Sequence, residues 1–256
     1  MDSQFAAGRN SPAILELPHV WHIDLRTPAV ERTGDLKMLS EKEHSQAQRF
    51  RNPLHRRRYV IAHGALREIL AHHSKLPPEA IALVENPNGK PHLAEDGSQS
   101  LIEFSLSHSG DHALVAVSNR QPIGVDIERI DSDTGVLAIA QRYFSEQEQE
   151  EIVQRPATRR LRHFFHLWVC KEAYVKARGE SIIDRLHTFS ISLENDIPTL
   201  ISDHRDPAAP ANWAMRFVDV PNGFTAALAI QGELGTQTLT PHSWYATNRD
   251  RGGHKP

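Results

Sequence analysis

Residues 81–129 contain a run of short β-prone segments separated by tight turns, and this run limits the possible folds more than any other part of the sequence. The segments are IALVEN, LIEFSLS, HALVAVSN and IGVDIER, and the turns among them include NPNGKP, HSGD and NRQP. Short turns between such segments favour antiparallel neighbours. We therefore expect an antiparallel meander in the middle of the chain.

Helical segments flank this meander. Ser40 and Glu43 have the spacing of a capping box, which predicts a helix from about residue 41. Apolar residues at helical intervals predict the others. The expected helices cover about 55–73, 135–143, 145–154 and 158–178, and the expected outer strands cover about 19–25, 188–194, 212–220 and 225–231.

Each half of the chain thus runs from helices to antiparallel strands, which predicts an α+β protein. We expect two similar subdomains related by a pseudo-twofold axis, each with helices packed on a small antiparallel sheet. The N-terminal subdomain covers 19–120 and the C-terminal one 121–235. Residues 1–18 and 236–256 lack regular periodicity and are expected to be loose tails.

Composition excludes several classes of protein. The hydrophobic content of 39% fits a globular chain with a buried core, and the single cysteine, Cys170, excludes an intramolecular disulfide framework. A formal net charge of -3 argues against a general nucleic-acid binder. No apolar run approaches the ~18 residues of a membrane span, and the N-terminus does not resemble a secretory signal. We expect a cytoplasmic protein.

The strand IGVDIER carries two carboxylates on one face. Ile123, Val125 and Ile127 should face one side, while Gly124, Asp126 and Glu128 share the other. The two carboxylates should repel each other, and a bound Mg²⁺ would remove that repulsion. Gly124 has no side chain and would leave room beside the two carboxylates. The alternative is a solvated edge strand whose acidic face meets water.

The helix expected over 158–178 places Glu172 in the middle of its apolar face. One explanation is an ion pair with Lys176 on an exposed face. The other is a third carboxylate for the same metal ion, with Lys171 and Lys176 placed to hold a pyrophosphate. On this second interpretation, only the first turns of the helix are core, and the face from Trp168 onward lines a polar cleft.

Five motifs together resemble the 4′-phosphopantetheinyl transferases of the surfactin-synthetase-activating (Sfp-like) class. They are GKP, FSLSHSG, PIGVDIE, RYFSEQE and WVCKEAYVK, which occur in the family's order and spacing between about residues 40 and 230. The resemblance implies the fold of that family. It also implies transfer of the 4′-phosphopantetheine arm of coenzyme A to a serine of an apo acyl or peptidyl carrier protein, with release of 3′,5′-ADP.

The resemblance also implies a role for individual residues. Asp126, Glu128 and Glu172 are expected to hold Mg²⁺, with Mn²⁺ as an alternative ion, and Glu172 and Lys176 are the expected catalytic residues. Glu148 and Trp168 are further candidates near the site. The residues expected to bind coenzyme A are Arg58, Lys90, Pro91, Ser107, His108, Lys171 and Lys176.

Two functions remain open at this point. The first is a Mg²⁺-dependent transferase that acts as a monomer on carrier proteins, without nucleic-acid or membrane partners. The second is a non-catalytic module that uses the same cleft to bind a carrier protein or a nucleotide. Three converging carboxylates favour the enzyme, because a binding module has no use for them. Whether Glu172 is the general base or only a metal ligand also remains open.

Overall fold

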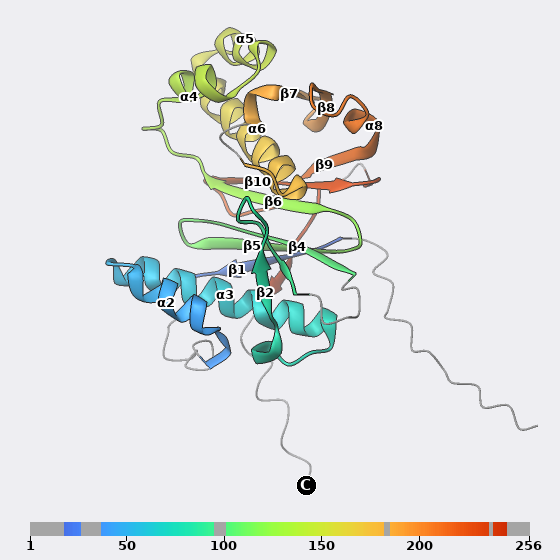
Figure 1. Cartoon of the computed structure of the whole chain (residues 1–256). Helices are drawn as coiled ribbons and strands as arrows, with labels where there is room; N and C mark the ends of the chain where they lie inside the picture. Colours follow the sequence, from blue (N-terminus) through green and yellow to red (C-terminus); the bar gives the residue numbers. More distant parts are fainter. Residues whose placement is uncertain (1–17, 27–36, 95–100, 182–184, 236–237, 245–256) are drawn as a thin grey trace, which may run out of the picture.

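The computed structural model describes residues 18–26, 37–94, 101–181, 185–235 and 238–244. These residues form four layers: helices, a four-stranded sheet, a three-stranded sheet and a second helical layer (Figure 1). This arrangement confirms the predicted α+β class. Within the described part of the chain, none of the helices has both the length and the apolar character needed to cross a membrane.

The first helical layer consists of α2 (Glu41–Arg49) and α3 (Pro53–Ser74). Ser40 and Glu43 form the predicted capping box at the start of α2. Asn52 caps α3, and Pro53 occupies its first turn, where a missing backbone donor costs nothing. A short 3-10 helix, η2 (Pro78–Ala80), and the hairpin of β2 (Leu83–Glu85) and β3 (Pro91–Leu93) follow.

The four-stranded sheet has the order β11-β1-β5-β4. Its strands are β1 (His19–Asp24), β4 (Ile102–Ser109), β5 (His112–Asn119) and β11 (His242–Trp244). Strand β11 pairs in parallel with β1. It falls inside 236–256, so the expectation of a loose tail is wrong for these three residues. Residues 1–17 of the expected N-terminal tail lie outside the described residues.

The three-stranded sheet has the order β6-β10-β9 and belongs to the second half of the chain. Its strands are β6 (Ile123–Arg129), β9 (Trp213–Phe217) and β10 (Phe224–Gln231). The helices α4 (Val136–Tyr143), α5 (Glu146–Gln154) and α6 (Ala157–Arg178) match the predicted ranges closely. The smaller elements are η3 (Leu186–Thr188), β7 (Phe189–Glu194), β8 (Ile197–Asp203) and α8 (Ala209–Asn212).

Strand β8 is absent from the sequence prediction. Pro198 interrupts its alternation, and proline within a strand-like run argues against a strand unless the run lies at an edge. In the fold β8 pairs only with β7 among the described strands, so a missing donor is tolerated there.

Three apolar cores hold the layers together. One lies between α3 and the four-stranded sheet, one between the two sheets, and one beneath α6. Ile123, Val125 and Ile127 all belong to the core between the sheets, which confirms the predicted apolar face of β6. The expectation that only the first turns of α6 are core is wrong, because buried residues continue as far as Ala177. Buried residues of α6 run from Phe164 to Ala177, whereas none of the first seven residues of the helix is buried.

Candidate active site

Gly124 decides how closely α6 approaches β6. A Cβ atom at this position would lie 2.0 Å from the carbonyl oxygen of Ala173 and 2.4 Å from the backbone nitrogen of Ala177. The helix backbone therefore fills the space that we expected to remain open beside the carboxylates, and that expectation is wrong. The close approach has a different consequence, since it brings Glu172 on α6 next to Asp126 on β6.

Two carboxylates share one ammonium group at this contact, and a third, that of Glu128, lies near enough to affect it electrostatically. Lys176 Nζ lies 2.6 Å from Asp126 Oδ1 and 3.7 Å from Glu172 Oε2. Asp126 is buried with 1% exposure, and its Oδ2 has no hydrogen-bond partner. Glu128 and Glu172 are partly buried. The site therefore holds more negative than positive charge, and one buried oxygen is left without a donor.

The charge surplus changes the protonation of the site. Burial raises the pKa of Glu172 to about 8, and the neighbouring charge of Asp126 adds to that effect. Burial also raises the pKa of Glu128, again with a contribution from Asp126. Burial acts to lower the pKa of Lys176, but Asp126 and Glu172 outweigh it and raise the pKa overall. Such shifts mark a place where an added cation would be favourable.

The carboxylates do not form a finished metal centre as they stand. In the described ranges, no group of three or more His, Cys, Asp and Glu side chains is arranged to hold a metal ion. The Lys176 ammonium supplies the nearby positive charge instead. The donor set itself suits a hard divalent cation, because it consists of carboxylate oxygens and includes the unpartnered Asp126 Oδ2.

A hollow of about 470 Å³ opens beside Glu128. Arg58 lines it from α3 and Trp168 from α6, so both halves of the chain contribute walls. Arg58 donates to Asp111 Oδ1, at 2.6 Å from its Nη2 atom, and this bond fixes the guanidinium at the rim. An anion in the hollow would therefore meet the Arg58 guanidinium, and Glu128 is the one carboxylate of the cluster that lines the hollow. The remaining lining residues are Ser109, Gly110, Arg129, Asp131, Thr134, Ile139, Phe164 and Phe165.

Lys171 and Glu148 lie elsewhere. Both side chains are fully buried, and Lys171 Nζ lies 2.8 and 2.6 Å from the two carboxylate oxygens of Glu148. The prediction that Lys171 binds coenzyme A is wrong for this structure, because its ammonium is enclosed in the core. Glu148 also forms the capping box of α5 with Ser145. Its role is structural, and it is not a residue of the candidate site.

Lys90 binds the end of α6. Its Nζ donates to the carbonyl oxygens of Ala177 at 3.1 Å and Ile123 at 3.3 Å. The neighbouring Asn86 and Asn88 both donate to the carbonyl of Gly179, the C-cap residue. The GKP loop therefore caps α6 through its orphan carbonyls, a function that the sequence analysis missed. Pro91, the next residue, begins β3 and is partly buried.

The residues of the SHS segment of β4, 107–109, differ in their exposure and in their contacts. His108 is exposed, whereas Ser107 is buried and donates its hydroxyl to Asp126 Oδ1 at 2.7 Å. Ser109 donates to Glu128 Oε2 at 2.8 Å. We expected Ser107 at the nucleotide and did not predict Ser109. In SLSHS every second residue is a serine, and in GVDIE the two carboxylates also lie two residues apart. This shared period of two is the sequence pattern that could have indicated the contacts.

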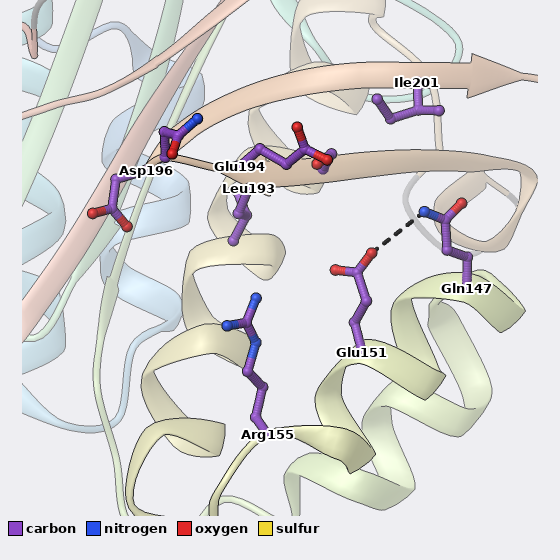
Figure 2. Close-up of a pocket in the computed structure, with 9 residues that line it drawn as sticks. Gln147, Glu151, Arg155, Leu193, Glu194, Asp196 and Ile201 are labelled. Atoms are coloured by element: carbon purple, nitrogen blue, oxygen red, sulfur yellow. Dashed lines mark hydrogen bonds between the residues drawn. The ribbon is translucent and has the colours of Figure 1, made fainter.

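A larger hollow, of about 750 Å³, lies away from these residues (Figure 2). It is formed by α5 and the turn between β7 and β8. Gln147 and Glu151 are joined there by a hydrogen bond of 3.3 Å, and Arg155 points toward the same space. None of the predicted site residues lines this hollow. Size alone therefore does not identify the site, and the raised pKa values of Glu128 and Glu172 make the carboxylate cluster the stronger candidate.

Comparison with known proteins adds independent evidence. The family profile described as 4'-phosphopantetheinyl transferase superfamily matches residues 122–229, and the profile 4'-phosphopantetheinyl transferase, N-terminal matches residues 29–120. The 4'-phosphopantetheinyl transferase HetI of Nostoc sp. is 33% identical over 227 residues, which cover 89% of this chain and 91% of HetI. The 4'-phosphopantetheinyl transferase Sfp of Bacillus subtilis is 27% identical over 161 residues, or 63% of this chain and 69% of Sfp.

Among solved structures, a holo-(acyl-carrier-protein) synthase from Bacillus anthracis in complex with CoA (3',5'-ADP) aligns with 44% of this chain and 96% of its own. The identity is 18% and the TM-score 0.36, too low to support an inference.

Proposed function

Because this chain belongs to the 4′-phosphopantetheinyl transferase superfamily, as an enzyme of the Sfp-like class, we propose that it transfers the 4′-phosphopantetheine arm of coenzyme A with the help of Mg²⁺. The acceptor is a serine of an apo acyl or peptidyl carrier protein, and the second product is 3′,5′-ADP. The observation that carries the proposal is the carboxylate cluster at the contact of β6 and α6, with its surplus charge and unpartnered Asp126 oxygen.

Asp126, Glu128 and Glu172 are the residues that would hold the metal ion. Their oxygens are the ligand type that Mg²⁺ prefers, and Mn²⁺ accepts the same set. When bound, Mg²⁺ would neutralise negative charge on the diphosphate of coenzyme A during the transfer. Burial and, to a smaller extent, the charge of Asp126 raise the pKa values of Glu128 and Glu172, and a divalent cation would offset both effects.

The protein's own groups would then handle the phosphates and the proton. The carrier serine oxygen forms a bond to the β-phosphorus of coenzyme A, and the bond from that phosphorus to the bridging oxygen breaks. Glu172 accepts the serine proton. Its pKa is raised to about 8 in the metal-free protein, and a bound divalent cation would lower that pKa and leave the carboxylate free to act as the base. Lys176, on the same helix, holds negative charge on the leaving 3′,5′-ADP.

The nucleotide end of coenzyme A is assigned to the hollow beside Glu128. Arg58 supports this assignment, because its guanidinium lines that hollow and is held at the rim by Asp111. His108 and Pro91 remain proposed contacts on the same half of the chain. Lys90 can contribute only if its ammonium leaves the carbonyls of Ala177 and Ile123.

The test combines the purified chain with coenzyme A, Mg²⁺ and an apo carrier protein, and follows the carrier by mass spectrometry. The wild type should add one phosphopantetheine to the carrier. Glu172→Gln should reduce transfer at least 100-fold, the usual contribution of general acid–base catalysis, while it leaves the fold intact. Glu150→Gln changes an exposed glutamate on α5 and should retain full transfer.

Unchanged turnover in Glu172→Gln would contradict the assignment of this residue. No transfer by the wild type to fatty-acid, polyketide or peptide carriers, with carrier binding retained, would favour the non-catalytic module. The comparisons give that alternative no support. The same series of carriers would also identify the class of physiological partner.

A further inference from the structure

Three serines of β4 bind the backbone of β6 where the two sheets meet. The hydroxyl oxygens of Ser105, Ser107 and Ser109 accept from the N–H groups of alternate residues on β6. The distances are 3.1 Å to the nitrogen of Val125, 3.4 Å to that of Ile127 and 3.0 Å to that of Arg129. Strand β6 is an edge strand of its sheet, so these hydroxyls satisfy donors that no neighbouring described strand reaches.

Two of these hydroxyls also donate to the carboxylates of the candidate site. Ser107 donates to Asp126, and Ser109 donates to Glu128. In each case the carboxylate belongs to the residue just before the N–H donor, so one hydroxyl binds strand and side chain together. Because such a serine uses both its oxygen and its proton, its orientation is fixed, and the carboxylate oxygen that it holds is fixed with it.

We propose that Ser107 and Ser109 are positioning residues that hold Asp126 and Glu128 in the orientation needed to bind the metal ion. The inference rests on the proposed function of these carboxylates. The two oxygens of Asp126 differ in their contacts. Oδ1 accepts hydrogen bonds from Ser107 and Lys176, whereas Oδ2 has no partner and is available to a metal ion. Outer groups of this kind orient metal ligands and tune their affinity.

Ser105 separates this role from the general role of joining the sheets. Its hydroxyl accepts from Val125 in the same way as the other two serines. The residue before Val125 is Gly124, which has no side chain to orient. Replacement of Ser105 therefore removes a bond between the sheets and nothing from the carboxylates. Ser109 is the better test residue than Ser107, because Ser107 also accepts from Lys176.

The experiment measures the affinity of the full-length protein for Mn²⁺ alone, from the electron paramagnetic resonance signal of the free ion. Ser109→Ala should weaken Mn²⁺ binding roughly tenfold, the lower end of the usual effect of such partners. Ser105→Ala should stay within about twofold of the wild type. Ser109→Thr keeps the hydroxyl and should restore most of the affinity. Thermal unfolding shows that each variant is folded.

Activity provides a second readout that a purely structural role would not move. Ser109→Ala should raise the Mg²⁺ concentration for half-maximal transfer by a similar factor, whereas Ser105→Ala should leave that concentration within about twofold of the wild type. Equal losses of Mn²⁺ affinity in Ser105→Ala and Ser109→Ala, or no loss in either, would overturn the positioning role alone. A wild-type protein that binds no Mn²⁺ would overturn the metal assignment as well, so the two failures are distinguishable.

Discussion

Helix α6 carries two lysines, Lys171 and Lys176, that both bind a carboxylate from another element, yet their surroundings differ completely. Lys171 Nζ donates to both oxygens of Glu148 and to the carbonyl of Phe189. Glu148 in turn accepts from the backbone of Ile191, and no exposed surface remains on either side chain of the pair. One positive charge is paired with one negative charge, and the ammonium and both carboxylate oxygens have hydrogen-bond partners.

The Lys176 cluster is unbalanced by contrast. One ammonium faces Asp126 and Glu172, with Glu128 nearby, and Asp126 Oδ2 has no donor. Lys176 keeps 26% of its side chain exposed, so a ligand can reach it. The comparison shows how to tell a structural ion pair from a binding site on the same helix. In the buried and neutral pair of Lys171 and Glu148, each charge is already compensated. In the Lys176 cluster, the excess negative charge and the unpartnered Asp126 oxygen favour the binding of a cation.

The largest effect is expected for Lys171→Met. This change leaves Glu148 as a buried charge without its partner, which should lower the free energy of unfolding by about 3–5 kcal/mol. Lys176→Met should cost less, about 1–3 kcal/mol, because protonation of a carboxylate or binding of a divalent cation can compensate for the lost ammonium in the more open cluster. Urea unfolding of both variants measures the difference. Similar losses in the two variants would break the distinction between the closed pair and the open cluster.

The second effect is a pH dependence of stability in the absence of divalent ions. The folded-state pKa of Glu172, about 8, lies above its ordinary value of 4.5, so the folded protein keeps a proton that the unfolded chain releases. Stability should therefore fall as the pH rises from about 5 to 8. In wild type relative to Glu172→Gln, this fall should amount to roughly 2–4 kcal/mol.

The comparison with Glu172→Gln is needed because buried histidines act in the opposite direction. Burial lowers the pKa of His73 to about 4, so that residue adds stability as the pH rises toward 6.5. Both proteins share this contribution, and it cancels in the difference. Saturating Mg²⁺ should remove most of the decline in the wild type. Parallel stability curves for the two proteins would show that Glu172 does not titrate in this range.

The smallest effect is expected for Lys90→Met. Lys90 differs from Lys171 and Lys176 because its ammonium donates to carbonyl oxygens of the backbone. Loss of its bonds to Ala177 and Ile123 should lower the free energy of unfolding by about 1 kcal/mol. The KM for coenzyme A should change little if capping α6 is its main role. A large rise in KM without loss of stability would instead return Lys90 to the nucleotide site, as its motif predicted.

Much of the fold was accessible from local sequence patterns. The capping box predicted at Ser40 is present, and the apolar face of β6 is buried as its alternation predicts. The failures involve partners that lie far away along the chain. Strand β11 pairs with β1 from the other end of the protein, and no local pattern indicates that contact.

The two lysines of α6 show where a finer interpretation was possible. At about 100° per residue, Lys171 is turned roughly 100° from Glu172, whereas Lys176 is turned only about 40° from it. Helical geometry alone therefore favours Lys176 as the partner of Glu172. It does not identify Glu148 as the partner of Lys171, because Glu148 comes from a separate helix.

The sequence by itself determined most of the elements, the apolar face of β6, the family and the three candidate carboxylates, because each of these depends on spacing along the chain. Only the tertiary structure decided how these pieces meet. It placed the α6 backbone against Gly124, buried Lys171, and set the serines of β4 against the carboxylates of β6. The physical reason is that periodicity fixes the direction of a side chain, whereas its partner depends on how distant elements pack.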